Sequence, residues 1–169
     1  NLLVPALNDP AALPADTEQE KAALKRAMWD AESHRTPNTV AIAPQQLARI
    51  AGFSIPADRK FIFVHGDGIG KEHLFSSEKL TTLLAVYKYS GFDQALAMMR
   101  AIYEVGGKGH SCGIYSFDQD HVHRLALADF PGRRAEAVGG APVLGRLHAF
   151  LEGVHAQLVL VQRFAGGQA

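Results

Sequence analysis

Short apolar runs alternate along the chain with longer segments in which apolar residues recur at helical spacing, a pattern typical of α/β proteins. The continuous apolar runs predict buried strands at 61–64, 82–89, 112–117 and 158–161. The helical spacing predicts helices at 17–30, 44–51, 92–105, 118–130 and from residue 142 onward. Because helices join successive strands, right-handed crossovers and a largely parallel sheet are expected. The predicted fold class is therefore α/β.

Local signals mark several helix ends and divide the chain. Thr17 and Glu20 have capping-box spacing at the start of the first helix. Pro44 suits the first turn of the second helix, and Gly52 is expected to end it. Three segments follow from this pattern: a proline- and alanine-rich leading arm at 1–15, a main segment at 16–131, and a C-terminal helix and strand at 132–169 that opens with a linker or turn at 132–140.

Charge and cysteine content narrow the possible settings of the protein. The 169 residues hold 17 Lys and Arg against 17 Asp and Glu, so no basic field indicates nucleic acid or a membrane surface. Cys112 is the single cysteine, which excludes an internal disulfide. The start has no signal-peptide pattern, and no apolar run reaches membrane-spanning length. A cytoplasmic protein is expected.

Two polar segments stand next to predicted strands. The first runs from Glu78 to Tyr87 and reads E-K-L-T-T-L-L-A-V-Y. The second runs from Gly106 to Ser116 and reads G-G-K-G-H-S-C-G-I-Y-S. Together they resemble two motifs of the CoA-acylating aldehyde dehydrogenases, E-K-L-S-P-x-L-A-x-Y and G-G-x-G-H-T/S. The resemblance covers about 21–129, is densest from residue 51 to the Cys112 strand, and is nearest to members acting on sulfoacetaldehyde.

The resemblance implies an aldehyde dehydrogenase catalytic-domain fold and roles for two residues. Glu78 would bind the cofactor, because a carboxylate offers two acceptor oxygens to the ribose diol beside the nicotinamide. His110 would be catalytic and lie near the nucleophilic thiol, where an imidazole could orient the thioester or assist proton movement as CoA attacks. The alternatives are a solvated Glu78 and a His110 that caps a strand or packs in the core. Lys79 is expected to be a structural or surface charge.

The family reaction implies NAD or NADP as cofactor, coenzyme A as co-substrate and a small aldehyde as substrate. Partners would be further copies of the chain in a homo-oligomer, or a cofactor domain; no nucleic acid or membrane is expected.

Other candidate sites are rejected on their own residues. Cys112 lies in an apolar strand, where a thiol behaves as a small hydrophobe, and the family's nucleophile belongs to a loop upstream of this chain. The loop 65–71 looks like a phosphate loop, but the glycine and hydroxyl spacing fails. His121 and His123 point to different sides of one helix, so no metal site is predicted.

The chain also departs from the family pattern. The nucleophile loop and the cofactor domain are missing, Thr81-Thr82 replaces Ser-Pro, and the segment 130–137 does not resemble the family's next strand. The sequence therefore predicts the catalytic-domain portion of an acylating aldehyde dehydrogenase, inactive by itself. The alternatives are a non-catalytic remnant or partner-binding α/β module, and a small nucleotide-binding protein that uses the 66–70 loop.

Overall fold

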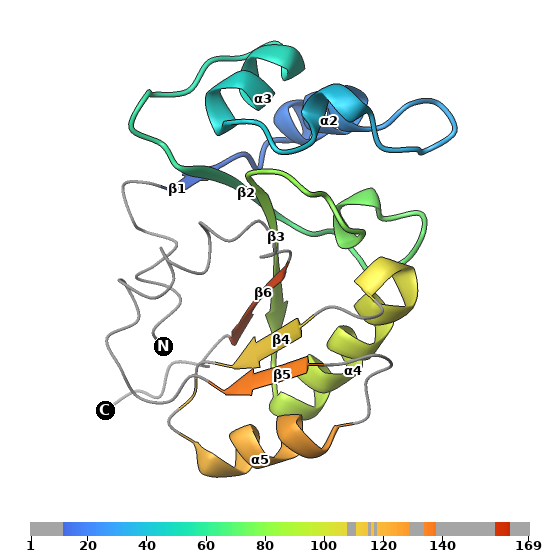
Figure 1. Ribbon diagram of the computed structural model, residues 1–169, viewed down its shortest axis with the longest axis vertical. Coiled ribbons are helices and arrows are strands. Elements are labelled where there is room, and N and C mark those ends of the chain that lie inside the picture. Colours follow the sequence, from blue (N-terminus) through green and yellow to red (C-terminus); the bar gives the residue numbers. More distant parts are fainter. Residues whose placement is uncertain are drawn as a thin grey trace.

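A parallel four-stranded sheet forms the centre of the structure, a computed structural model that describes residues 12–107, 111–114, 116, 118–128, 134–137 and 158–162 (Figure 1). Its strand order is β1 (Ala12–Pro14), β2 (Phe61–His65), β3 (Leu83–Tyr89) and β6 (Leu158–Gln162). A second parallel pair joins β4 (Ser111–Ile114) to β5 (Arg134–Ala137). The predicted α/β class with a parallel sheet is confirmed.

The helices fall where the apolar spacing predicted them, and the last two end a few residues earlier. They are α2 (Glu18–Met28), α3 (Pro44–Ala51), α4 (Phe92–Ile102) and α5 (Gln119–Leu127). Short 3₁₀ turns lie at Pro37–Thr39 and Leu74–Ser76, and a π turn at Tyr103–Gly107 follows α4. Gly52 ends α3 with a φ of 89°, as predicted. The helix predicted from residue 142 lies outside the described residues. None of the described helices is long and apolar enough to cross a membrane.

Two apolar clusters hold these elements together. In the larger one, Leu24 and Met28 of α2 and Leu47 of α3 pack against Ile62 and Val64 of β2. Side chains alternate along a strand, so Ile62 and Val64 belong to the face that α2 and α3 cover. The smaller cluster joins α4 to α5 through Leu96, Met99, Tyr103, Leu125 and Ala128. In Figure 1, α2 and α3 lie at one end of the molecule, and α4 and α5 lie toward the other.

Two predictions about the chain's irregular segments were wrong. Ala12–Pro14, placed in the leading arm, forms β1 and pairs with Phe61–Phe63. Arg134–Ala137, placed in a linker, forms β5 and pairs with β4. Neither segment has an apolar strand pattern; each is extended because a neighbouring strand supplies hydrogen-bond partners for its backbone. The final strand predicted at 158–161 is confirmed as β6.

The first helix begins with the predicted capping box, and this gives a stability test. The Glu20 amide donates to Thr17 Oγ1 at 3.1 Å, and the Thr17 amide donates to Glu20 Oε2 at 3.1 Å. Thr17→Ala is expected to lower the free energy of unfolding by about 1 kcal/mol, because the Glu20 amide loses its acceptor Oγ1 and Glu20 Oε2 loses the hydroxyl donor at 2.7 Å. Urea denaturation measures the change, and the exposed neighbour Gln19→Ala is the control. Equal stabilities of the two variants would contradict the capping role.

Candidate functional site

Glu78 lies at the amino end of β3, between the Leu74–Ser76 turn and the strand, and its side chain is half-buried. The turn that follows α4 comes close to it: a β-carbon placed on Gly106 would lie 3.9 Å from the Glu78 amide nitrogen. The structure therefore brings Glu78 beside the start of the glycine-rich segment that leads to His110. His110 itself lies outside the described residues.

Lys79, next to Glu78, is buried, with 2% of its surface exposed. Its Nζ donates to the Phe75 carbonyl at 2.8 Å and to the Ser77 carbonyl at 2.9 Å. The pKa of Lys79 is lowered to about 7, chiefly by burial and also by repulsion from Arg35, while the charge of Glu78 acts in the opposite direction. Through these two hydrogen bonds the buried Lys79 side chain holds the backbone of residues 75–77, which precede Glu78, close to residue 79, which follows it.

Arg35, in the connection between α2 and α3, also holds the backbone next to Glu78 in place. Its guanidinium donates to the Lys79 carbonyl at 2.8 Å and to Thr39 Oγ1 at 2.9 Å, and it also hydrogen-bonds the Met28 carbonyl. Burial lowers the pKa of Arg35. These bonds tie two parts of the chain that are far apart in sequence.

Leu80 has a left-handed backbone with φ of 47°, a conformation that costs a non-glycine residue roughly 1–3 kcal/mol. Its carbonyl accepts from the Ala41 amide at 2.7 Å. The hydrogen bonds of Lys79 and of the Leu80 carbonyl hold the backbone of Leu80 in this conformation. They therefore also restrict the backbone of the neighbouring Glu78.

The loop after β2 lies at the other, carboxyl end of the sheet. Its backbone packs tightly on aromatic rings: a β-carbon on Gly66 would lie 2.2 Å from the Tyr87 ring, and one on Gly68 would lie 2.4 Å from the His73 ring. Asp67 forms an ion pair with Lys21 of α2 at 2.7 Å, and this contact lowers the pKa of Asp67. The start of this loop lies at the carboxyl edge, and its later part returns toward Glu78, because the Gly70 amide donates to Ser76 Oγ at 3.2 Å, two residues before Glu78.

The cysteine and the two histidines that the sequence analysis rejected as site residues lie on a strand and a helix away from Glu78. Cys112 lies in β4, as the apolar pattern predicted. His121 stacks on Phe92 with ring centroids 4.1 Å apart, whereas His123 is exposed. Within the described part of the chain, no three His, Cys, Asp or Glu side chains converge in a way that could hold a metal ion.

Sequence reasoning missed Arg35, which carried no signal in the sequence. Lys79 was expected to be a structural or surface charge, and its burial and its two carbonyl contacts fit the structural alternative.

Comparison with known proteins places this fold among the aldehyde dehydrogenases. No family model matches the chain. A sulfoacetaldehyde dehydrogenase from Acholeplasma sp. is 28% identical over 147 residues, which cover 85% of this chain and 30% of that protein. The crystal structure of an acetylating aldehyde dehydrogenase from Geobacillus thermoglucosidasius matches with a TM-score of 0.74 at 30% identity, over 85% of this chain and 31% of that one. The chain is homologous to the CoA-acylating aldehyde dehydrogenases over most of its length.

Two further solved structures share the fold and contain ligands. An engineered glycolyl-CoA reductase with bound NADP+ has a TM-score of 0.65 at 18% identity, over 79% of this chain and 29% of that one. A Rhodopseudomonas palustris propionaldehyde dehydrogenase with bound propionyl-CoA has a TM-score of 0.62 at 19% identity, over 73% and 26%. At these identities the likeness shows the fold alone.

The extent of the match corrects one sequence-based expectation. This chain spans about 30% of the length of the relative from Acholeplasma. A match that covers 85% of 169 residues must continue past residue 129, where the resemblance was expected to stop. The strand β5 lies in this continuation.

Proposed function

We propose that this chain is the catalytic-domain portion of an NAD(P)-dependent CoA-acylating aldehyde dehydrogenase, which converts an aldehyde, CoA and NAD(P)+ into an acyl-CoA. The observation that carries the proposal is the homology to these enzymes together with the fixed position of Glu78 beside the glycine-rich turn. The residues of this chain would not turn over substrate by themselves, because the nucleophilic thiol and most of the cofactor site belong to other parts of the relatives.

Glu78 has the chemistry to hold the cofactor's ribose. A carboxylate presents two acceptor oxygens, which suit the two hydroxyls of a ribose. Lys79 and Arg35 hold the backbone around Glu78, which restricts the positions that its carboxylate can take. A hydrogen-bond acceptor in a fixed position would orient the bound ribose, and with it the nicotinamide ring, for reaction. NAD(P)+, when bound, supplies the hydride acceptor.

His110 is assigned to the acyl-transfer half of the reaction. It follows Gly106, whose backbone approaches that of Glu78, by four positions in the sequence. An imidazole can move a proton near neutral pH, which suits the attack of CoA on an acyl group. The proposed partners are a small aldehyde, CoA, and either further copies of the chain or a cofactor domain.

A segment exchange tests this function. The isolated chain is expected to give no NAD(P)H from aldehyde and CoA. Residues 12–128, transferred into the acetylating enzyme from Geobacillus thermoglucosidasius in place of its matching segment, are expected to support acyl-CoA formation. In that chimera Glu78→Gln should raise the KM for the nicotinamide cofactor about tenfold, because one charged acceptor is lost.

Glu72→Gln is the matched control, since its carboxylate is 72% exposed and lies outside the E-K-L segment. Turnover by the isolated chain, or an active chimera in which Glu78→Gln leaves the KM for the cofactor unchanged, would contradict the proposal. A folded chimera with no activity would favour the non-catalytic module.

A further inference from the structure

A carboxylate and a histidine form a fixed pair at the carboxyl edge of the sheet. Asp16 follows β1, and His65 ends β2. Asp16 Oδ1 accepts the His65 amide at 2.7 Å, and Asp16 Oδ2 lies 2.6 Å from the ring Nδ1. The Phe63 ring meets the imidazole edge-on, with ring centroids 5.8 Å apart. These contacts fix the orientation of the His65 ring.

The pairing with Asp16 also sets the chemistry of the His65 ring. An ionised carboxylate only accepts hydrogen bonds, so Nδ1 carries the proton of the neutral imidazole. The other ring nitrogen, Nε2, then presents a lone pair, and the side chain is 39% exposed. Nε2 can therefore accept a proton, and the charge of Asp16 stabilises the imidazolium that forms. Base and carboxylate have this relation in the Ser-His-Asp arrangement of hydrolases.

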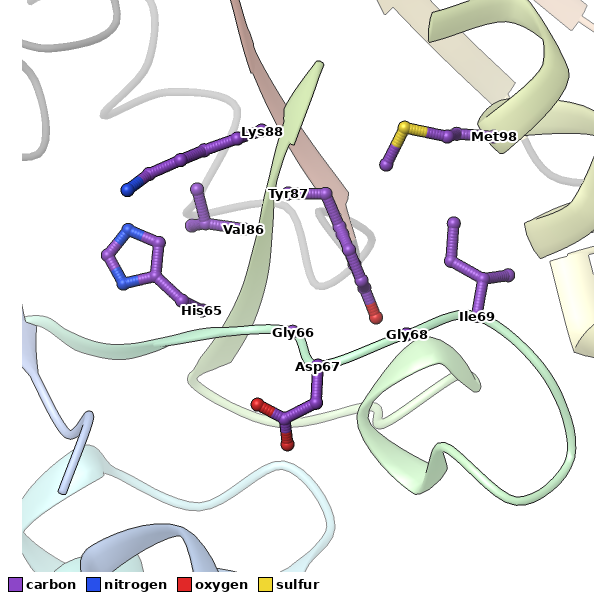
Figure 2. Close-up of a pocket in the computed structure, with 9 residues that line it drawn as sticks. All are labelled: His65, Gly66, Asp67, Gly68, Ile69, Val86, Tyr87, Lys88 and Met98. Atoms are coloured by element: carbon purple, nitrogen blue, oxygen red, sulfur yellow. The ribbon is translucent and has the colours of Figure 1, made fainter. Parts of the chain in front are cut away.

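Lys88 of β3 lies on the same face of the sheet as His65. His65 is in register with Val86, and side chains alternate along a strand. Residues 65, 86 and 88 therefore project from one face, and Tyr87 projects from the other. Both His65 and Lys88 line a cavity of about 330 Å³. Figure 2 shows the two side chains extending from the same side of β3, with a ring nitrogen of His65 directed toward the Lys88 ammonium.

The surroundings of Lys88 suit a nucleophilic amine. Its side chain is exposed, and it forms no ion pair with any residue that the structure describes. In contrast, Lys21 is paired with Asp67 at 2.7 Å, and Lys79 is buried against backbone carbonyls. An amine attacks only after its ammonium form has lost a proton, and a neighbouring base assists that loss. Lys88 thus combines exposure with a base on the adjacent strand.

We propose that Lys88 is a modification site whose Nζ takes an acyl group from an acyl thioester, with His65 as the base and Asp16 as the residue that positions it. The choice of a thioester rests on the proposed function, whose product is an acyl-CoA. Acylation leaves a neutral amide at residue 88 and removes one positive charge from this edge of the sheet.

The reaction consumes only the thioester. His65 Nε2 takes one proton from the Lys88 ammonium, directly or through one water. The Nζ lone pair then attacks the thioester carbonyl, so that an N–C bond forms and the C–S bond breaks. The departing sulfur takes a second proton from the nitrogen, which yields a free thiol and an amide. The imidazolium returns its proton to water, and Asp16 again faces a neutral ring.

Incubation of the full chain with S-acetyl-N-acetylcysteamine, a thioester without the CoA nucleotide, followed by mass-spectrometric peptide mapping, tests the site. Lys88 is expected to be acetylated at least about tenfold faster than Lys60, because general base catalysis contributes roughly 10²–10⁴-fold. Lys60 is exposed and precedes β2, at the other end of that strand from His65, so it reports an unassisted lysine in the same molecule. The thioester is supplied from outside, so the outcome does not depend on dehydrogenase activity.

His65→Asn tests the base, because asparagine keeps an N–H donor for Asp16 and lacks Nε2. In this variant Lys88 should fall to the rate of Lys60. Asp16→Asn still offers an acceptor to the His65 amide but no charge to the imidazolium, so Lys88 should react at an intermediate rate. His34→Asn, which alters a histidine side chain that is 78% exposed, should leave the ratio of the two rates unchanged.

The ratio of the two acetylation rates in the unaltered chain decides the proposal even where a variant fails to fold. Equal rates at Lys88 and Lys60 in that chain, or a folded His65→Asn variant in which Lys88 keeps its advantage, overturn the proposal.

Discussion

The free energy of unfolding is expected to rise by about 4 kcal/mol between pH 7 and pH 10, and Lys79 is the cause. In the folded chain the pKa of Lys79 is lowered to about 7, and the ordinary value is 10.5. Between these values the unfolded chain binds a proton that the folded chain does not. Folding must therefore release the Lys79 proton, and the free-energy cost of that release falls as the pH rises toward 10.5, so stability increases.

The neutral amine of Lys79 can still make the hydrogen bonds seen in the folded chain. It retains two N–H donors, enough for the carbonyls of Phe75 and Ser77. The other shifted groups act outside this window, Asp67 at acid pH and the rest at higher pH. The pKa of Tyr87 is raised to about 12 and that of Lys21 is raised above 10.5, so both reduce stability only at higher pH, as the unfolded forms lose their protons first.

Urea unfolding at about pH 7, 8, 9 and 10 measures the effect. Lys79→Met preserves most of the side-chain volume without a titrating group, so its stability should be nearly flat across the window. Lys71→Met, which removes an exposed lysine, should rise with pH as the unaltered chain does. A Lys79→Met variant with the full pH dependence would show that another group is responsible.

Local sequence signals predicted most of the fold. The Thr17 capping box and the Gly52 helix end both require particular residue types, and both occur as expected. The apolar runs of β2 and β3 are buried on nearly every residue. In contrast, Ala12–Pro14 and Arg134–Ala137 have no such pattern, since pairing with a neighbouring strand decides their conformation. The extended conformation of these two segments is therefore set by the sequences of β2 and β4, with which they pair.

The candidate site around Glu78 also has a part that local sequence predicts and a part that it does not. Glu78 could be found because its motif is contiguous in the sequence. Its supports could not be found, since Arg35 and Lys79 are 44 positions apart and a lysine is seldom fully buried.

Arg35→Met is expected to lower the free energy of unfolding by about 2–3 kcal/mol. The substitution removes the donors to the Lys79 carbonyl and to Thr39, and it leaves partly buried acceptors without partners. It also removes a positive charge that lowers the pKa of Lys79. That pKa should rise, so the stability gained between pH 7 and pH 10 should shrink.

A double-mutant cycle with Lys79→Met tests whether Arg35 and Lys79 act as one unit. The combined loss at about pH 7 should differ from the sum of the single losses by more than 0.5 kcal/mol, roughly the limit for independent sites. Arg49→Met is the matched control, because Arg49 is exposed in the last turn of α3. Additive losses, with an unchanged pH dependence in Arg35→Met, would mean that Arg35 supports the α2–α3 connection alone. The segment around Glu78 would then keep its conformation without Arg35.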